Sequence, residues 1–81
     1  MLSTSRVDTL QQQFGNVVRR RREAAGLSQE ALAGKAGLHR TYISLLERGR
    51  RMPSIEVVRQ LAVALETTMA SLMVELEGSE D

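Results

Sequence analysis

The sequence predicts an all-α fold, a compact bundle of five helices in one domain. Apolar residues recur at steps of three and four along most of the chain, and no stretch alternates apolar and polar residues as a half-buried strand does. Glycines and Ser, Thr or Pro residues divide the chain into five such segments. The 81 residues include one Phe, one Tyr, no Trp and no Cys, so the core is small and has no disulfide to support it. Chains of this size often gain stability by oligomerising, and we therefore expect a surface for a partner subunit.

The first helix is predicted over residues 6–25. Ser5 and Asp8 have the spacing of a capping box at its start, and Gly26 is the residue type that commonly follows the end of a helix. An apolar stripe runs along one side of this segment, and we expect the helix to pack by that side. The stripe consists of Val7, Leu10, Phe14, Val17 and Val18.

Two short helices follow, separated by the three-residue turn "GLH". Ser28 is an N-cap residue for the second helix, which is predicted to extend to Gly37. The third helix is predicted over residues 40–48, and Gly49 stops it. The inward residues of the two helices are Leu32, Ala33 and Ala36 in the second, and Ile43 and Leu46 in the third.

Pro53 and Ser54 predict the start of a fourth helix, and Thr67 or Thr68 the start of a fifth. The domain is expected to cover residues 1–77, and residues 78–81 are expected to form a disordered acidic tail. The inward residues of the fourth helix are predicted to be Ile55, Val58, Leu61, Ala62 and Leu65, and the apolar stripe of the fifth helix is Met69, Leu72, Met73 and Leu76.

The turn between the second and third helices is short enough to hold them at a steep angle. Gly37 can adopt the left-handed conformation that such a turn needs, Ala33 leaves room for the crossing, and Ile43 is β-branched. These features predict a helix-turn-helix, which projects its second helix outward in a shape that fits the major groove of B-DNA. Ordinary packing of two helices would use the same three residues, so both interpretations are open at this point.

The net charge of +1 conceals a division of charge along the chain. Residues 6–59 carry all 11 Lys and Arg against five acidic residues, a net +6, whereas residues 60–81 carry five acidic residues and no Lys or Arg, a net −5. Such a division lets a folded domain present a basic face to a polyanion while its acidic end points away. The alternative is a solvated surface without a polyanionic partner.

The segment "LSQEALAGKAGLHRTYISLLERGRRMPS" resembles the lambda-repressor-like helix-turn-helix family. The shared pattern is LSQxxLAxxxGL, then a recognition helix ending in ERG, then a Pro-Ser helix start, and the resemblance extends from about Val18 to Leu72. Within this family the words "RTYIS" and "ERGRRMPS" are most similar to the controller proteins of restriction-modification systems, although phage-type and chromosomal repressors share them. The sequence departs from the family pattern at Glu66, where the fourth helix usually ends in Gly, and in four consecutive arginines, Arg19 to Arg22.

The resemblance implies that the third helix contacts DNA bases. Arg40 can bond O6 and N7 of guanine, and Thr41 can offer a methyl group to thymine. Tyr42 either contacts DNA through its hydroxyl or packs against the core, and Leu45 either touches DNA or covers the core. The residues expected to contact bases are Arg40, Thr41, Tyr42 and Ser44.

Phosphate contacts are implied for residues that flank this helix. Gln29 lies at the first position of the second helix, where free backbone amides favour a phosphate oxygen. His39 lies in the turn and is expected to cap the third helix or contact phosphate. The cations after the third helix can hold the sugar-phosphate backbone, which fixes affinity and register. The predicted set is Gln29, His39, Arg48, Arg50 and Arg51.

The family also pairs an arginine of the first helix with a glutamate that ends the recognition helix. These residues correspond to Arg22 and Glu47 in this sequence. Such a buried pair orients the recognition helix more than it stabilises the fold, because desolvation offsets much of the attraction. The other arginines of the run point in different directions at about 100° per residue, and we expect solvent around them.

The function that follows is transcriptional control by a homodimer on double-stranded DNA. Two recognition helices about 34 Å apart would bind an inverted-repeat operator near a promoter, and the dimer would activate or repress, with autoregulation and possible contact with RNA polymerase. The competing interpretation is an antitoxin or adaptor that uses the same fold to bind a protein. The dimer interface is expected in the fifth helix and just before it, at Leu65, Met69, Met73 and Leu76, and Val63 could add to it.

An enzyme is not expected, because the chain has one His, no Cys and no glycine-rich phosphate loop. We expect no cofactor, no metal and no membrane partner. The first residues, "MLSTSRVDTLQQQ", lack the apolar central region of a signal peptide. The expected location is the cytoplasm, with nucleoid association, for a bacterial or phage-encoded protein.

Overall fold

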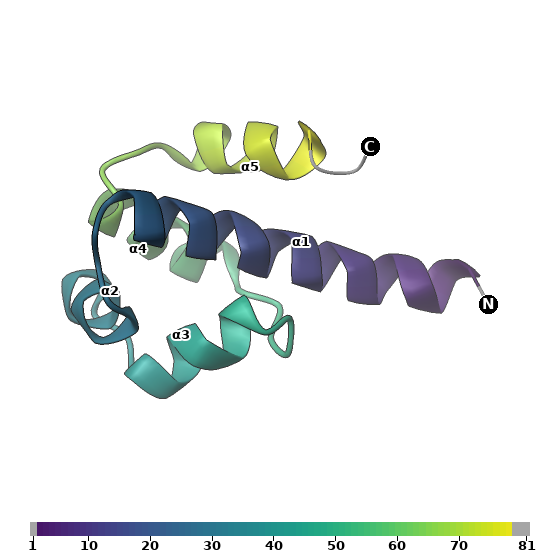
Figure 1. Cartoon of the computed structure of the whole chain (residues 1–81). Coiled ribbons are helices and arrows are strands. Elements are labelled where there is room, and N and C mark those ends of the chain that lie inside the picture. The colour runs from purple at the N-terminus through teal and green to yellow at the C-terminus, as the bar shows by residue number, and fades with distance from the viewer. Residues whose placement is uncertain (1, 79–81) are drawn as a thin grey trace.

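A computed structural model describes the backbone of residues 2–78 and the side chains from Leu10 to Gly78. Within that part of the chain all regular structure is helical, so the predicted all-α, five-helix architecture is confirmed. In Figure 1, α1 crosses the molecule, with α5 on one side and α2 and α3 on the other, and its N-terminal turns extend past the other helices. The helices are α1 (Leu2–Ala24), α2 (Gln29–Ala36), α3 (Arg40–Glu47), α4 (Ile55–Ala64) and α5 (Met69–Gly78).

The start of α1 differs from the prediction. The helix begins at Leu2, so Ser5 lies inside it and the predicted capping box at residue 5 is wrong. Residues 2–5 contain neither Gly nor Pro, and nothing in their backbone chemistry prevents the helix from continuing toward the N-terminus. The other end is as expected, because α1 stops at Ala24 and Gly26 adopts a left-handed φ of 73°.

The starts of α2, α4 and α5 follow the predicted capping residues. The Ser28 hydroxyl accepts a hydrogen bond from the Ala31 backbone N–H at 3.0 Å, and Ser54 accepts one from Val57 at 3.1 Å. Thr68 Oγ1 accepts from the Ser71 N–H at 3.0 Å, which places the start of α5 where it was expected. α5 includes Gly78, one residue into the segment predicted to be a tail, and the rest of that segment lies outside the described residues.

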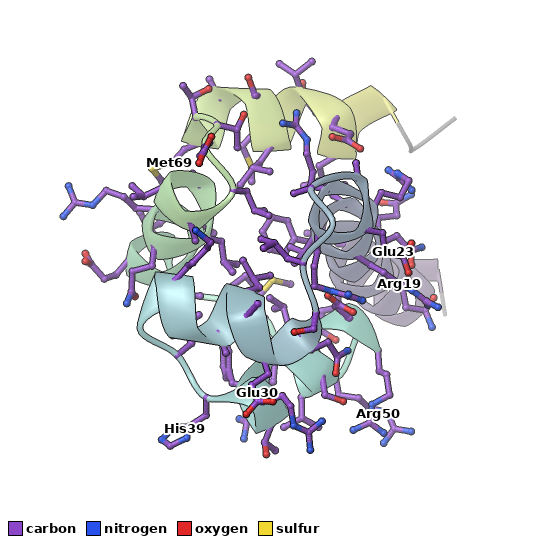
Figure 2. All side chains as sticks on the ribbon, turned by 60° about the vertical axis from the view of Figure 1, so that its left-hand side comes forward. Arg19, Glu23, Glu30, His39, Arg50 and Met69 are labelled. Atoms are coloured by element: carbon purple, nitrogen blue, oxygen red, sulfur yellow. The ribbon has the colours of Figure 1, made fainter. Side chains whose placement is uncertain are left out.

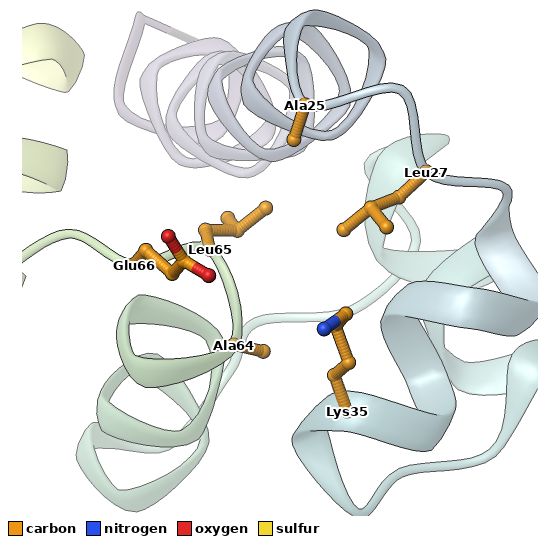
Figure 3. A pocket seen from close by; sticks show the side chains of 6 residues that line it. All are labelled: Ala25, Leu27, Lys35, Ala64, Leu65 and Glu66. Carbon is orange, nitrogen blue, oxygen red and sulfur yellow. The ribbon is translucent and has the colours of Figure 1, made fainter.

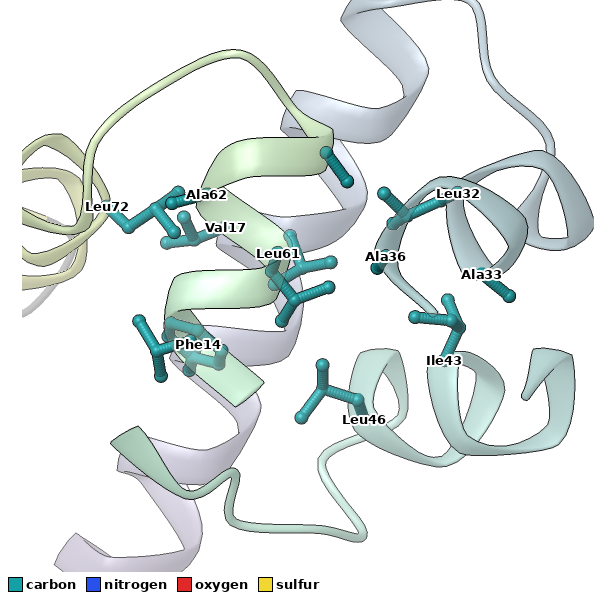
Figure 4. Packing of buried hydrophobic residues seen from close by; sticks show 13 residues of the cluster. Phe14, Val17, Leu32, Ala33, Ala36, Ile43, Leu46, Leu61, Ala62 and Leu72 are labelled. Carbon is teal, nitrogen blue, oxygen red and sulfur yellow. The ribbon is translucent and has the colours of Figure 1, made fainter. Parts of the chain in front are cut away.

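The core lies between α1, α2, α3 and α4, and Leu72 adds α5 to it (Figure 4). Ile55 was predicted to face inward but is 75% exposed. It is the first residue of α4, where little of the neighbouring helices covers it, and the inward stripe begins one turn later at Val58. The fully buried large side chains are Val17, Val18, Leu32, Ile43, Leu46, Leu61 and Leu72.

The turn from α4 to α5 contains the one non-glycine residue with a positive φ in the described chain. Glu66 has φ 57°, in the left-handed region where L-residues other than Asn and Asp cost about 1 to 2 kcal/mol. The sequence departs from the family pattern at this position, where Gly is usual, and the chain nevertheless adopts the left-handed conformation that glycine favours.

α4 and α5 are the most apolar helices of the fold. None of the described helices is by itself both long and apolar enough to cross a membrane, whereas α4 and α5 taken together pass that test by length and composition but are bent by 101° at the break between them. In the fold they pack against each other, and their inward residues Val58, Leu61 and Leu72 are buried in the core.

Candidate nucleic-acid interface

α3 has one side fixed in the core and one side free. Ile43 and Leu46 are completely buried between the helices, which anchors the inner side of α3. On the outer side Arg40 and Thr41 are exposed and Ser44 is partly exposed. Tyr42 is half-buried and packs against the core, so its ring supports the helix whatever its hydroxyl contacts. The N-terminal half of α3 is therefore accessible to a large partner.

His39 precedes α3 in an extended conformation, but its side chain makes no capping hydrogen bond. His39 therefore occupies the N-cap position of α3 without capping it through its side chain, and its expected contact with phosphate stays a prediction. The imidazole is exposed, and it lies at the same end of the molecule as the exposed side chains of Arg50 and Glu30 (Figure 2). Glu30 is an acidic neighbour that the sequence analysis did not assign to this surface.

Three exposed arginines follow α3 in the connection to α4. Arg48 Nε donates to the Ser44 carbonyl oxygen at 3.4 Å, so this side chain lies back along its own helix. Arg50 and Arg51 make no side-chain hydrogen bond or ion pair with the described residues. Gly49, between Arg48 and Arg50, has φ 73° and provides the turn that ends α3.

Arg22 and Glu47, which the family resemblance pairs, form a two-point ion pair. Arg22 Nε lies 2.7 Å from Glu47 Oε2, and Nη2 lies 3.0 Å from Oε1. The side chains are 12% and 4% exposed, and Arg22 Nη1 also donates to the Leu27 carbonyl at 2.9 Å. The hydrogen bond to Glu47 raises the pKa of Arg22, against the effect of its burial. α1 thus holds the C-terminal end of α3 and the start of the loop before α2.

Gln29 takes a position that the sequence analysis missed. Its amide nitrogen donates to Glu47 Oε1 at 3.0 Å, so a residue of α2 joins the pair between α1 and α3. An amide nitrogen carries two hydrogens, and the second remains available together with the free backbone amides at the start of α2. The contact of Gln29 with phosphate stays a prediction. The hydrogen bond from Gln29 to Glu47 would hold the side-chain amide in one direction for such a contact.

Gly15 is a second residue whose role the sequence analysis missed. α1 passes so close to the end of α3 that a Cβ atom at Gly15 would lie 2.9 Å from the Glu47 carbonyl oxygen and closer still to that of Leu46. A glycine inside a helix costs about 1 kcal/mol relative to alanine, and that unfavourable residue was the only signal in the sequence. The glycine allows α1 to lie directly on the last turn of α3.

The arginine run on α1 is paired more than expected. Arg19 Nε lies 3.5 Å from Glu23 Oε2 on the surface of the same helix. Arg20 and Arg21 both contact Glu75 of α5, at 3.2 and 2.8 Å, so these two arginines remain partly solvated, as predicted, but are also paired with an acid, which was not predicted. Glu75 was not predicted as a partner because it lies more than 50 residues away in the chain. Hydrogen bonds from Arg21 and then Arg20 lower the pKa of Glu75, although burial opposes the shift.

This pairing changes where positive charge remains on the surface. Arg19 to Arg22 of α1 are paired with Glu23, Glu47 and Glu75, and Arg59 lies 3.6 Å from Glu56. Most of the cations left without an acidic partner among the described side chains belong to α3 and the loop after it. They are Arg40, Arg48, Arg50 and Arg51, together with Lys35 on α2.

The residues predicted for the dimer interface are half-buried and lie on α5 and at the end of α4. They pack against it beside Leu72, which is completely buried. Val63 and Val74, on α4 and α5, are 69% and 68% exposed and are the large apolar side chains most open to solvent on these two helices after Ile55. The predicted interface residues are Leu65, Met69, Met73 and Leu76.

A small open pocket lies between the α1–α2 turn, α2 and the end of α4 (Figure 3). Its volume is about 330 Å³, and the ammonium of Lys35 and the carboxylate of Glu66 lie at its edges. Four apolar residues line the rest of it: Ala25, Leu27, Ala64 and Leu65.

Among the described residues no group of three or more His, Cys, Asp or Glu side chains is placed to hold a metal ion.

The chain matches known proteins along most of its length. The family described as helix-turn-helix domain covers residues 13–76. The chain is 41% identical over 69 residues to an uncharacterised HTH-type transcriptional regulator of Mycobacterium tuberculosis, with 82% of this chain and 49% of that protein covered. It is 35% identical over 65 residues to the control protein C.MunI of Mycoplasma sp, with 79% and 88% covered.

Solved structures agree in fold. The clp gene regulator ClgR from C. glutamicum has a TM-score of 0.83 at 30% identity, over 89% of this chain and 94% of that one. The restriction-modification controller protein C.AhdI from Aeromonas hydrophila has a TM-score of 0.74 at 43% identity, over 75% and 92%.

The chain spans about half the length of the mycobacterial regulator, but most of C.MunI and C.AhdI. The family match covers the α2–α3 unit together with the helices that hold it, which are the parts that carry the exposed face of α3. The chain therefore belongs to the helix-turn-helix family and is related to the restriction-modification controller proteins.

Proposed function

We propose that the chain is a sequence-specific DNA-binding regulator of transcription that places the N-terminal half of α3 in the major groove. The observation that carries this proposal is the two-sided character of α3. Ile43 and Leu46 fix its inner side in the core, and Arg40 and Thr41 stand free on its outer side. A rigid helix with a free polar face is what recognition of base edges needs.

Arg40, Thr41, Tyr42 and Ser44 are the residues proposed to contact bases. Arg40 lies in the first turn of α3 without an acidic partner among the described side chains, so its guanidinium is free to bond O6 and N7 of a guanine. Thr41 and Ser44 offer hydroxyls, and the hydroxyl of Tyr42 makes no hydrogen bond with the described residues. Four side chains read only a few base pairs, which is too little for a unique genomic site.

Phosphate contacts are proposed for the residues around α3, namely Gln29, His39, Arg48, Arg50 and Arg51. The support is the distribution of charge, since Arg19 to Arg22 of α1 are paired with acids, whereas the arginines after α3 have no acidic partner among the described side chains. Contacts of this kind supply affinity and fix the register of the helix in the groove.

A homodimer on an inverted repeat is the proposed form of binding. The half-buried apolar residues Met69, Met73 and Leu76, with Leu65 and the exposed Val63 and Val74, make the α4–α5 side the proposed interface. The similarity to C.MunI and C.AhdI supports a controller protein that regulates a restriction-modification operon and its own gene, and contact with RNA polymerase would accompany activation. The phage-type or chromosomal repressor is the alternative within the same family.

Salt dependence and footprinting on the DNA upstream of the gene test this proposal. The three arginines proposed to contact phosphate, Arg48, Arg50 and Arg51, make six cationic contacts in a dimer, and affinity should therefore fall at least about 10³-fold between about 50 and about 200 mM salt. The footprint is expected to show two protected half-sites related by two-fold symmetry. An affinity that does not change with salt, or protection without symmetry, would contradict the proposed mode of binding.

A further inference from the structure

α5 is held to the rest of the fold at two points by one arginine of α1. Arg21 Nη1 donates to Oγ1 of Thr67, which lies just before α5, at 3.0 Å. Arg21 Nε donates to Oε1 of Glu75, which lies at the end of the second turn of α5, at 2.8 Å. Arg20 Nε occupies the other carboxylate oxygen of Glu75 at 3.2 Å. We call Arg20, Arg21, Thr67 and Glu75 the α1–α5 clamp.

Apolar packing alone holds α5 at few positions. Leu72 is the completely buried residue of this helix, whereas Met69, Met73 and Leu76 are only half-buried. Half-buried side chains restrain the rotation and sliding of a short helix less than completely buried ones do, because part of their surface lies outside the core. The clamp removes this freedom, because it fixes the chain before α5 and a side chain two turns later, on the side of α5 that faces α1.

Arg22, the next residue of α1, holds α3 in a similar way. Arg22 binds Glu47, the last residue of α3, at 2.7 Å, and it points away from Arg21 by about 100° around α1. Two neighbouring arginines therefore connect α1 to α5 on one side and to α3 on the other, as the placement of α1 between those helices allows (Figure 1). These two residues therefore link the orientation of α3 to that of α5 through α1, in addition to the packing of both helices on the core.

We propose that Glu75 is a positioning residue that determines which separation of DNA half-sites the dimer accepts. The inference rests on the proposed function, in which α5 lies at the dimer interface and α3 in the major groove. If both hold, the angle between α5 and α3 within one subunit fixes the distance and the rotation between the two recognition helices of the dimer. A clamp that holds this angle makes the dimer selective for one spacing, whereas a loose α5 lets the two helices adjust to several.

The partial exposure of the clamp agrees with a role in geometry. Glu75 is 28% exposed, and Arg20 and Arg21 are 51% and 32% exposed. Ion pairs that water reaches contribute little to stability, because solvent screens them and ordering two long side chains costs entropy. Both oxygens of one carboxylate are nevertheless engaged by separate arginines, which restricts its direction more than a single contact would.

The test compares Glu75→Gln with the control Glu77→Gln, which removes the same charge from the same helix. Glu77 is exposed and forms no ion pair with the described residues. Affinity is measured for a single half-site and for operators whose two half-sites are moved apart or together by one and two base pairs. We expect both variants to bind the half-site within about twofold of the parent protein. The preference of Glu75→Gln for the best spacing over its neighbours should fall at least fivefold, and that of Glu77→Gln should not change.

Arg21→Lys provides a second variant that does not depend on the fold tolerating an uncharged residue 75. Lysine keeps the positive charge but has a single ammonium group in place of the separate Nε and Nη1 donors that bind Glu75 and Thr67. The preference of the dimer for one half-site spacing should therefore fall as it does in Glu75→Gln. Unchanged preference in Glu75→Gln and in Arg21→Lys would overturn the inference. A parent protein that binds the half-site but binds all spacings equally would also overturn the inference. If the parent protein binds no half-site at all, the proposed function fails instead, and the two results are distinguishable.

Discussion

Arg22→Ala is expected to lower the free energy of unfolding by about 3 to 5 kcal/mol, since breaking a buried ion pair leaves a charge without compensation. The carboxylate of Glu47 is only 4% exposed and would keep the Gln29 amide as its one remaining side-chain donor. The Leu27 carbonyl would also lose the donor at 2.9 Å that Arg22 supplies. Urea unfolding followed by circular dichroism measures the change, and DNA affinity should fall with it because Glu47 ends α3.

Arg19→Ala is the matched control. Arg19 belongs to the same arginine run and also pairs with a glutamate, but both side chains of that pair are more than half exposed. Its removal should change the unfolding transition little. Glu47→Gln is expected to cost less than Arg22→Ala, because it removes the buried charge and leaves Arg22 with its carbonyl partner and some access to water. Equal effects of Arg22→Ala and Arg19→Ala would mean that burial does not set the importance of the pair.

Gly15→Ala is expected to lower the free energy of unfolding by about 1 to 3 kcal/mol, the usual range for extra atoms forced into a packed interface. Alanine is the better helix former by about 1 kcal/mol, so a substitution judged by propensity alone would stabilise α1. The added methyl group would instead meet the carbonyl oxygens of Leu46 and Glu47, which are backbone atoms that cannot turn aside. The end of α3 must then move away from α1.

Gly34→Ala separates the two effects. Gly34 lies inside α2, and a Cβ atom there would meet nothing within 4 Å. Propensity then acts alone, and the variant should be more stable by up to about 1 kcal/mol. Opposite signs for the two glycines in one urea series support the close contact of α1 with α3, whereas a Gly15→Ala protein as stable as the parent would rule it out.

The helix ends and the inner faces were predictable because their chemistry is local. Ser28 and Ser54 cap helices through hydroxyls that reach the backbone three residues ahead, and Gly37 turns the chain without help from the rest of the fold. Predictions failed where tertiary surroundings decide. Ile55 has the spacing of an inward residue but lies in a turn of α4 with little cover, and Ser5 has the chemistry of a cap in a helix that simply continues.

The candidate site divides in the same way. The pairing of Arg22 with Glu47 could be expected from the family resemblance, whereas the partners of Arg20 and Arg21 depend on where α5 returns to α1. Gln29 was assigned to phosphate from its place at a helix start, and its contact with Glu47 depends on the crossing of α2 with α3. Periodicity describes the faces of one helix, but contacts between helices need the fold.

The proposed function requires Arg40 to bond a guanine in the major groove. Methylation interference at guanine N7 tests this contact directly, because N7 lies in that groove and is one of the two atoms that an arginine bonds. Operator DNA methylated sparsely at N7 is separated into bound and free fractions, with the parent protein and with Arg40→Ala. Methylation of one guanine in each half-site, about one helical turn apart, is predicted to exclude DNA from the fraction bound by the parent protein and to have no effect at those positions for Arg40→Ala. The same interference pattern with both proteins, or none with the parent, would contradict the proposal that α3 reads bases through Arg40.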